Sequence, residues 1–245
     1  MATSQPDRPR GRLRTGTSGF AYRDWSPLFY PAGIAGPDLL RAYSARLDAC
    51  ELNNTFYRSP TESAIAGWLA ATPDDFRFAV KAQRGGSLRS MTVDPAGSVP
   101  WLTAPLRSFG QRLGTVLFRV PDNLERDDAR LAALLAAWPR DLPLTLEFQN
   151  PSWHVDETFA AMAEAGAVLC ATDLDELPEP PTIRRTGAFL YLRLRRTSYE
   201  LADLADWASR IEPFLAAGDD AFVFFRHDAA GASAVRAIGL ARLLT

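Results

Sequence analysis

Four ionisable side chains occupy comparable positions in separate apolar segments of the chain. They are Glu51 in ACELNNTF, Lys81 in FRFAVKA, Glu147 in LTLEFQ and Arg193 in FLYLRLR. In each segment the charged residue alternates with apolar residues, as expected for a strand with one apolar face. Charges on the inner faces of strands are stable only if they lie close enough to pair. A paired set of carboxylates and cations could transfer protons and stabilise negative charge that develops in a reaction.

Lys81 is the only lysine among the 27 lysine and arginine residues. An amine can transfer a proton or form an imine, whereas a guanidinium group does neither readily. Imine chemistry requires a depressed amine pKa, but Glu51 on the neighbouring strand is expected to keep Lys81 charged. We therefore predict that Lys81 and Arg193 stabilise negative charge and that Glu51 or Glu147 moves a proton. A salt-bridge network that only fills the interior is the alternative interpretation.

Further candidates lie at the ends of the predicted strands. Asp173, at the end of AVLCATD, is a fifth catalytic candidate, although it shares its strand face with the apolar Leu169. Aromatic and polar residues after the strands predict the wall of a pocket for a small anionic or polyhydroxylated ligand, or else side chains that only pack over one end of the fold. The predicted ligand-binding residues are Ser18, Tyr22, Trp25, Asn53, Phe56, Tyr57, Arg119, Gln149, Trp153, Arg195 and His227.

Strand and helix patterns alternate along the chain. Strands are predicted at residues 13–19, 48–56, 76–83, 115–121, 144–150, 167–173, 189–196 and 221–228. Helices are predicted at residues 37–47, 59–71, 99–113, 125–138, 154–166, 199–217 and 230–244. Ser59 and Glu62 have the spacing of a capping box, and Gly166 and Gly218 stand where helices should end. The prolines within residues 174–188 cannot occupy a helix interior, so this segment is predicted to be an extended loop.

This alternation predicts parallel strands joined by right-handed crossovers, and about eight such units in about 250 residues make a TIM barrel. An open doubly wound sheet is disfavoured because no G-x-G-x-x-G turn follows the first strand. The predicted fold is therefore α/β, a TIM-barrel-like (β/α)8 barrel with one helix replaced by a Pro-rich loop. Residues 1–12 are predicted to be a disordered tail and residues 13–245 a single domain. Active sites of such barrels form at the carboxyl ends of the strands.

The composition of the 245 residues, with 47% hydrophobic and 23% charged residues, is typical of a soluble domain. A net charge of −2 argues against nucleic acid as a partner. Cys50 and Cys170 lie in apolar segments and are predicted to be buried thiols, which fits a cytoplasmic location. The sequence contains no predicted membrane span or signal peptide. No cofactor is predicted, and the oligomeric state is left open.

Two hydrolytic alternatives also use these residues. Glu51 and Glu147 could form a glycosidase pair, but nearby Lys81 and Arg193 would hold both carboxylates ionised, whereas a general acid needs a raised pKa. The same cations disfavour a divalent metal at these carboxylates. We therefore predict a metal-independent enzyme for a small anionic or polyhydroxylated substrate, without choosing between hydrolase, lyase and isomerase. The alternatives are a non-catalytic binding or sensing protein and a glycoside or phosphodiester hydrolase.

Four segments resemble the YecE-like family, known as domain of unknown function 72. They are GTSGFAYRDWSPLFYPAG, ELNNTFYRSPTESAIAGWLAATPDDFRFAVKA, LEFQNPSW and YLRLRRTSYELADLADWA. The resemblance spans nearly the whole chain and implies a TIM-barrel-like fold with a cleft at the strand carboxyl ends and no established activity. Characteristic positions are matched by Glu51, Asn53, Phe56, Tyr57, Lys81, Glu147, Trp153 and Arg193. The chain departs from the family pattern at Arg119, Gln149, Arg195, Arg196 and residues 226–228, which implies a different ligand.

Overall fold

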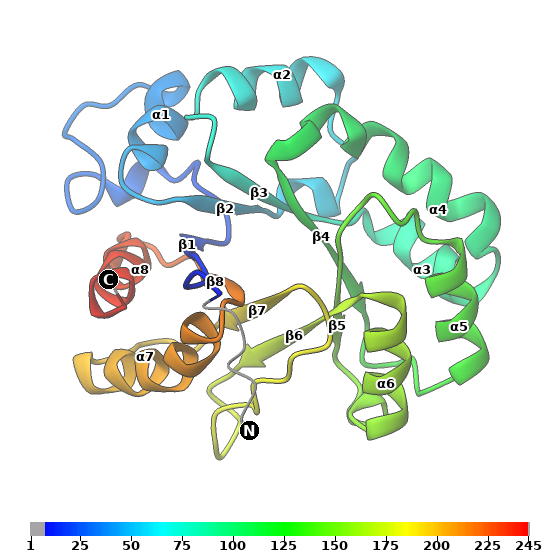
Figure 1. Cartoon of the computed structure of the whole chain (residues 1–245). Helices are drawn as coiled ribbons and strands as arrows, with labels where there is room; N and C mark the ends of the chain where they lie inside the picture. Colours follow the sequence, from blue (N-terminus) through cyan, green and yellow to red (C-terminus); the bar gives the residue numbers. More distant parts are fainter. Residues whose placement is uncertain (1–7, 245) are drawn as a thin grey trace.

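The computed structural model describes residues 8–244, in which eight parallel strands form a nearly closed barrel (Figure 1). The strands are β1 (Leu13–Thr17), β2 (Ala49–Leu52), β3 (Arg77–Lys81), β4 (Leu113–Val120), β5 (Leu144–Phe148), β6 (Val168–Asp173), β7 (Phe189–Leu194) and β8 (Asp220–Phe225). Their order around the sheet is β1, β8, β7, β6, β5, β4, β3, β2. The predicted α/β, TIM-barrel-like fold is thereby confirmed.

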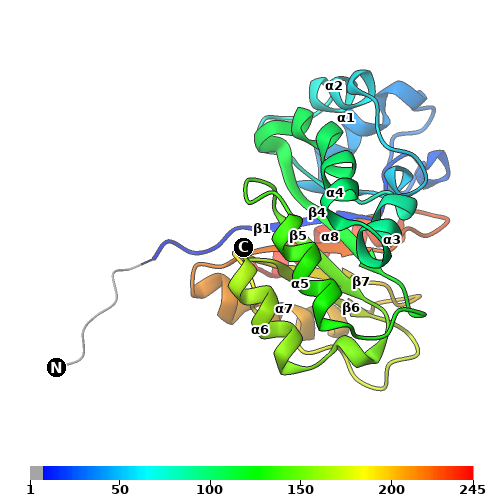
Figure 2. The same cartoon turned by 90° about the vertical axis from the view of Figure 1, so that its right-hand side faces the viewer.

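The helices cover the outside of the sheet, and α5 and α6 lie next to each other outside β5 and β6 (Figures 1 and 2). They are α1 (Leu39–Ser44), α2 (Glu62–Ala70), α3 (Arg84–Thr92), α4 (Pro95–Thr103), α5 (Asp128–Ala137), α6 (Asp156–Ala165), α7 (Leu201–Ala216) and α8 (Ala232–Leu243). Short 3-10 segments are Arg23–Trp25, Gly36–Asp38, Asn54–Phe56, Ala104–Arg112 and Pro151–Trp153. Residues 174–188, all of them described, contain no helix, as their prolines predict.

The connection between β3 and β4 differs from the prediction of one helix at residues 99–113. It contains α3, α4 and the 3-10 segment Ala104–Arg112. Within that segment Gly110 adopts φ 53°, which breaks the helical path. The helix α3 was missed because its sequence, RGGSLRSMT, has two glycines and no strong apolar periodicity.

Helix ends agree with the sequence in part. Gly166 and Gly218 adopt positive φ angles of 72° and 87° at the ends of α6 and α7, as predicted. The predicted capping box of Ser59 was wrong, because Thr61 is the N-cap of α2 and accepts a hydrogen bond from the backbone N of Ala64 at 3.2 Å. Both residues can cap a helix, and Thr61 directly precedes the first helical residue.

The predicted tail falls partly outside the described residues, which exclude 1–7. Within its remainder, Arg10 instead pairs with Glu212 of α7, and Arg12 pairs with Asp75 at 2.7 Å. The backbone N of Gly11 donates to the carbonyl O of Leu215 at 2.8 Å. The chain is therefore attached to the barrel before β1 begins. Within residues 8–244, no helix is long and apolar enough to span a membrane.

Two junctions in the barrel, here called seams, have little backbone pairing. Between β1 and β2 the described residues share an isolated bridge, Ser18 with Glu51. Between β5 and β6 they pair only at Thr145 with Val168 and at Leu146 with Leu169. Beyond those pairs the described residues of β5 and β6 form no further backbone pairing. The barrel therefore consists of two four-stranded halves, β6–β7–β8–β1 and β2–β3–β4–β5, that meet at the seams.

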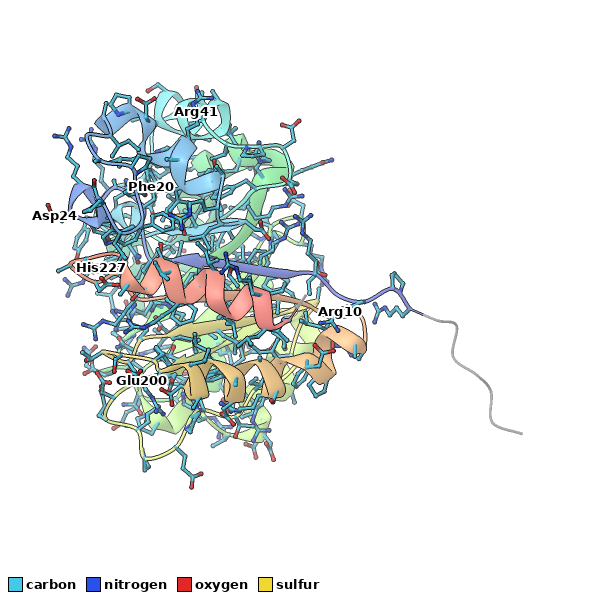
Figure 3. The ribbon with its side chains drawn as sticks, turned by 90° about the vertical axis from the view of Figure 1, so that its left-hand side faces the viewer. Arg10, Phe20, Asp24, Arg41, Glu200 and His227 are labelled. Carbon is cyan, nitrogen blue, oxygen red and sulfur yellow. The ribbon has the colours of Figure 1, made fainter. Side chains whose placement is uncertain are left out.

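The inner face of the barrel is layered along its axis. The lower layer is apolar and buried, and it comprises Ala49, Ala79, Leu117, Val168, Cys170, Tyr191, Phe222 and Phe224. The upper layer, at the mouth formed by the strand carboxyl ends, is charged. In Figure 3, Asp24, Glu200 and His227, which follow strands, lie at the mouth end, whereas Arg10, which precedes β1, lies at the opposite end. The apolar layer closes the barrel from below, so a ligand can reach the charged layer only from above or through a seam.

Candidate active site at the barrel mouth

The charged layer follows directly from strand alternation. Glu51, Lys81, Arg119, Glu147 and Arg193 each stand two positions after an inward residue of the same strand, and so point to the same side. The sequence-based prediction that Glu51, Lys81, Glu147 and Arg193 lie on inner faces agrees with this arrangement. Arg119 lies next to Glu147 in this layer, because the register of β4 with β5 pairs these two residues.

Arg193 is the centre of a buried ionic cluster with two carboxylates. Its Nε and Nη2 donate to Glu51 Oε2 and Oε1 at 2.9 and 2.8 Å, and its Nη1 donates to Glu147 Oε1 at 2.6 Å. All three residues are buried, at 0% exposure for Glu51, 4% for Glu147 and 2% for Arg193. Burial opposes the charged form of Arg193, but both carboxylates favour it and raise its pKa well above the usual value. Arg193 therefore remains a permanent cation.

Glu51 is saturated with hydrogen-bond donors. Besides Arg193, its Oε1 accepts from Ser18 Oγ at 2.7 Å and Asn53 Nδ2 at 3.2 Å, and its Oε2 accepts from the Tyr191 hydroxyl at 2.8 Å. Burial alone would raise the pKa of Glu51, but the charge and hydrogen bonds of Arg193, with those from Ser18 and Tyr191, lower it to about 2. A carboxylate with this pKa is a poor base. The geometry assigns Glu51 to positioning Arg193 rather than to moving a proton.

Glu147 retains one oxygen for another partner. Its Oε1 accepts from Arg193 and from Thr172 Oγ1, the latter at 3.0 Å. Its Oε2 lies 3.3 Å from Arg119 Nε, but neither buried atom has a well-aligned hydrogen bond among the described residues. Burial opposes ionisation, but the charges of Arg193 and Arg119 lower the pKa of Glu147. A buried oxygen without an aligned donor is suited to a donor supplied by a ligand or by water.

The prediction that Glu51 keeps Lys81 charged was wrong, because the two side chains do not pair. β2 aligns Glu51 with Ala79, so Lys81 lies two residues nearer the mouth, and within residues 8–244 its ammonium forms no salt bridge with a carboxylate. Its Nζ instead lies 4.3 Å from the centroid of the Phe56 ring. Burial and the nearby charge of Arg193 outweigh the two carboxylates and lower the pKa of Lys81 to about 8. The amine is therefore available to gain or lose a proton near neutral pH.

A cleft of about 490 Å³ opens beside this cluster, at the seam between β5 and β6. Its inner end contains Arg119, Glu147, Thr172 and Arg195. Its outer end is lined by residues of β5, β6, α6 and the Pro-rich loop, namely Phe148, Phe159, Leu169, Ala171, Leu174, Leu177 and Pro181. The rim carries Gln149, Pro151, His154, Glu179, Thr182 and Arg184, and Cys170 completes the lining. The volume is in the range of small-molecule sites.

The predicted ligand-binding residues are divided between several places. Arg119, Gln149 and Arg195 line the cleft. Ser18 and Asn53 bind Glu51, and Phe56 contacts Lys81, so these three support the charged layer. On the far side of the mouth, Tyr22 and His227 stack with their ring centroids 5.0 Å apart and their planes at 7°. Tyr57 is 79% exposed, and its ring packs edge-on against Phe56.

Asp173, Trp25 and Trp153 also lie outside the charged layer. Asp173 faces away from the barrel interior and binds Arg196 Nε at 2.9 Å and the Tyr199 hydroxyl at 2.8 Å. Trp25 and Trp153 are fully buried, and their indole N–H groups donate to backbone carbonyls. Strand alternation, which puts Asp173 on the same outward face as Leu169, therefore predicted the orientation of Asp173 correctly, and its selection as a catalytic residue was wrong. The two tryptophans pack beneath the loops.

Tyr191 and Thr172 are site residues that sequence reasoning did not select. Tyr191 donates to Glu51, and Thr172 donates to Glu147. Both share an inward strand face with an already identified residue: Tyr191 precedes Arg193 by two positions, and Thr172 follows the inward Cys170. This alternation was the available signal, but a neutral hydroxyl gives no indication in sequence that it contacts a buried charge.

No group of three or more His, Cys, Asp or Glu side chains within residues 8–244 has an arrangement that could hold a metal ion. Cys50 and Cys170 are buried free thiols, and burial raises the pKa of both. The candidate site therefore rests on the charged layer and the adjoining cleft.

Comparisons with known proteins agree with this architecture. A family model described as "Protein of unknown function DUF72" matches residues 14–245. The UPF0759 protein YunF of Bacillus subtilis (strain 168) is 26% identical over 251 residues, which cover 84% of this chain and 86% of that protein. A DUF72 family protein from Thermotoga maritima MSB8 has a similar solved structure, with a TM-score of 0.82 and 24% identity over 95% of this chain and 99% of that one. A DUF72 family protein from Enterococcus faecalis V583 gives a TM-score of 0.76 and 20% identity, with 95% of each chain covered.

Proposed function

Since the chain belongs to the DUF72 family, whose description names no activity, we propose a function from the chain's own side chains. The protein is proposed to be a metal-independent barrel enzyme that transfers a proton to or from a small anionic or polyhydroxylated substrate. Lys81 is the proton-transferring group in this proposal. The observation that carries it is the Lys81 amine, which lies within a charged layer, has no carboxylate partner among the described residues, and has a pKa of about 8. A general base or acid works best with a pKa near the working pH.

The other charged residues have separate roles in this proposal. Arg193 is fixed by Glu51 and Glu147, and it depresses the pKa of Lys81 by its charge. Glu51 holds Arg193 in place and does not move a proton, because its pKa is about 2. Glu147 lines the cleft, and its second oxygen, which is buried without an aligned donor, accepts a hydrogen bond from a substrate hydroxyl in this proposal.

The charge of the mouth supports an anionic substrate. Four cations, Lys81, Arg119, Arg193 and Arg195, lie around two carboxylates, Glu51 and Glu147. The cations are in excess whether Lys81 is protonated or neutral. The side chain of Arg195 lines the cleft and makes no hydrogen bond or salt bridge with any residue in the described part of the chain. Such a guanidinium group is available for a carboxylate or phosphate.

A non-catalytic binding protein is the second candidate, and it is favoured by the saturation of Glu51. A buried carboxylate that is fully hydrogen-bonded contributes order rather than reactivity. A glycoside hydrolase has less support, because the pKa values of Glu51 and Glu147 are both lowered and neither supplies a protonated carboxyl group.

Solvent-proton exchange separates these candidates. The protein is incubated in D2O with a chelator and a panel of hydroxy acids, keto acids, aldoses and sugar phosphates, and deuterium uptake at carbon is followed by mass spectrometry. We expect uptake or conversion of at least one compound by the native protein and none by Lys81→Met. Compounds that raise the unfolding temperature without uptake or conversion would favour the binding protein instead.

The titration of Lys81 gives a prediction that needs no substrate. Because the chain contains one lysine, labelling with 15N-lysine yields one side-chain amine signal. We expect its chemical shift to titrate with a midpoint near pH 8 in the folded protein, and near the ordinary lysine value in urea. A folded-state midpoint above about pH 10 would contradict the proton-transfer role, since the amine would then remain an ammonium ion at neutral pH.

A further inference from the structure

The cleft at the seam between β5 and β6 joins two chemically different surfaces. Glu147 and Thr172 belong to the inward faces of β5 and β6, whereas Phe148 and Leu169 belong to the outward faces that pack against the helices. A cleft lined by both faces connects the inside of the barrel with its outside at this seam. This is possible because β5 and β6 stop pairing after Leu146 with Leu169.

The inner end of the cleft is built for a negative charge. Arg195 offers a guanidinium group without a partner in the described part of the chain, and Arg119, whose side chain is one-third exposed, lines the same cleft. The nearby Glu147 Oε2 is buried, has no aligned donor and would repel an anion in direct contact. The anionic group is therefore best placed on Arg195 and the exposed side of Arg119, with a hydroxyl group or water donating to Glu147.

The outer end of the cleft is apolar. It is lined by Phe159 of α6, by Leu177 and Pro181 of the Pro-rich loop, and by Phe148 and Leu169. Leu177 is half-buried, and Arg184 covers the ring of Phe159 at 4.7 Å from its centroid. The loop stands where a regular barrel of this type would have a helix between β6 and β7. An extended loop covers less of the sheet than a helix and leaves apolar surface for a ligand.

We propose that the cleft binds an amphipathic anion, with a carboxylate or phosphate head on Arg119 and Arg195 and an apolar chain that passes through the seam towards α6 and the Pro-rich loop. The inference goes beyond the proposed function, because Lys81 does not line the cleft, and it names the class of ligand that the cleft takes. It favours an anion with an apolar chain over a polyhydroxylated molecule, because seven apolar residues line the outer end and the groups that could bind hydroxyls there are those of the rim.

Calorimetric titration with a series of simple probes tests the proposal. Butyrate, hexanoate and octanoate share one head and differ in chain length, octyl phosphate changes the head, and octanol removes the charge. We expect octanoate or octyl phosphate to bind with a dissociation constant of about 1 mM or lower. Affinity should rise about fourfold for each methylene group added to the carboxylate. Octanol should bind much more weakly than either anion.

Matched variants locate the two halves of the ligand. Arg195→Met is expected to weaken octanoate binding about tenfold or more, whereas Arg140→Met, which changes an exposed arginine outside the cleft, should not. Leu177→Asp should weaken binding about tenfold by placing a charge against the apolar chain, whereas Leu201→Asp, on a leucine that is 73% exposed, should not.

The outcomes separate this inference from the proposed function. Equal binding of butyrate and octanoate, equal binding of octanol and octanoate, or no binding of any probe would overturn the inference. Lys81→Met should retain octanoate binding, because Lys81 does not line the cleft. Octanoate binding without any proton transfer in the D2O panel would leave the inference standing and remove the enzyme. Proton transfer without octanoate binding would support the proposed enzyme and overturn the inference about the cleft.

Discussion

Lys81→Arg is expected to lower turnover by a factor of about 10² to 10⁴ while leaving the protein folded. The substitution keeps a positive charge in the layer, but a guanidinium group stays protonated and cannot exchange a proton at neutral pH. The measurement is the initial rate on whichever compound of the D2O panel reacts, together with the thermal unfolding temperature. The native Lys81 amine has a pKa of about 8, so a lost rate with unchanged folding would reflect proton transfer rather than charge.

Two further variants control this experiment. Lys81→Met removes both the charge and the proton-transferring group, and it serves if the larger arginine disturbs the site. Lys81→Cys treated with bromoethylamine restores an amine at the same position, and recovery of the rate is expected. Native protein treated in the same way controls for reaction of the reagent at Cys50 and Cys170. Full activity of Lys81→Arg on a compound that the native protein converts would show that the amine does not move the proton.

Arg193→Met is expected to destabilise the protein by about 3–5 kcal/mol at pH 7, because it leaves two buried carboxylates without their cation. The pH dependence of stability should also reverse. In the native protein the pKa of Glu51 is about 2 when folded and near 4.5 when unfolded, so its contribution is complete above pH 4.5 and is lost as pH falls towards 2. Without Arg193, burial raises the pKa of Glu51 above the unfolded value, and the variant gains stability as pH falls towards 4.5.

Urea unfolding followed by tryptophan fluorescence at pH 7, 6 and 5 measures both effects. The double variant Glu51→Gln with Arg193→Met is the matched control, because it removes one of the stranded charges and should regain part of the lost free energy of unfolding. An Arg193→Met protein that loses less than about 1 kcal/mol and keeps the native pH dependence would mean that the cluster carries little stability.

The sequence was sufficient to predict the barrel, the Pro-rich loop and the inward faces of the charged residues. All three depend on local patterns: the alternation of strands and helices, the prolines, and the two-residue period of a strand. The connection between β3 and β4 was not predictable to the same degree, because the glycines of α3 mask a helix that tertiary contacts stabilise.

Pairing within the charged layer could not be read from the sequence. Lys81 stands on the strand next to Glu51, and adjacency favoured an ion pair between them. The register of β2 with β3 instead places Lys81 two residues nearer the mouth, while Arg193 reaches Glu51 from the other half of the barrel. The separation of β5 and β6, which creates the cleft, likewise depends on register rather than on the sequence of either strand.

At the two seams, the charged layer joins the halves of the barrel. Arg193, Tyr191 and Thr172 belong to one half of the barrel and bind Glu51 and Glu147 of the other half. The halves are thus clasped by side chains where backbone pairing is sparse. A substitution of Glu147 that changed the ligand preference would also remove the hydrogen bonds that join the two halves. A substitution of Arg195 or in the Pro-rich loop would leave those hydrogen bonds in place. Among proteins built this way, ligand specificity should therefore diverge first through the residues of the cleft rim, while Glu51, Glu147 and Arg193 stay unchanged.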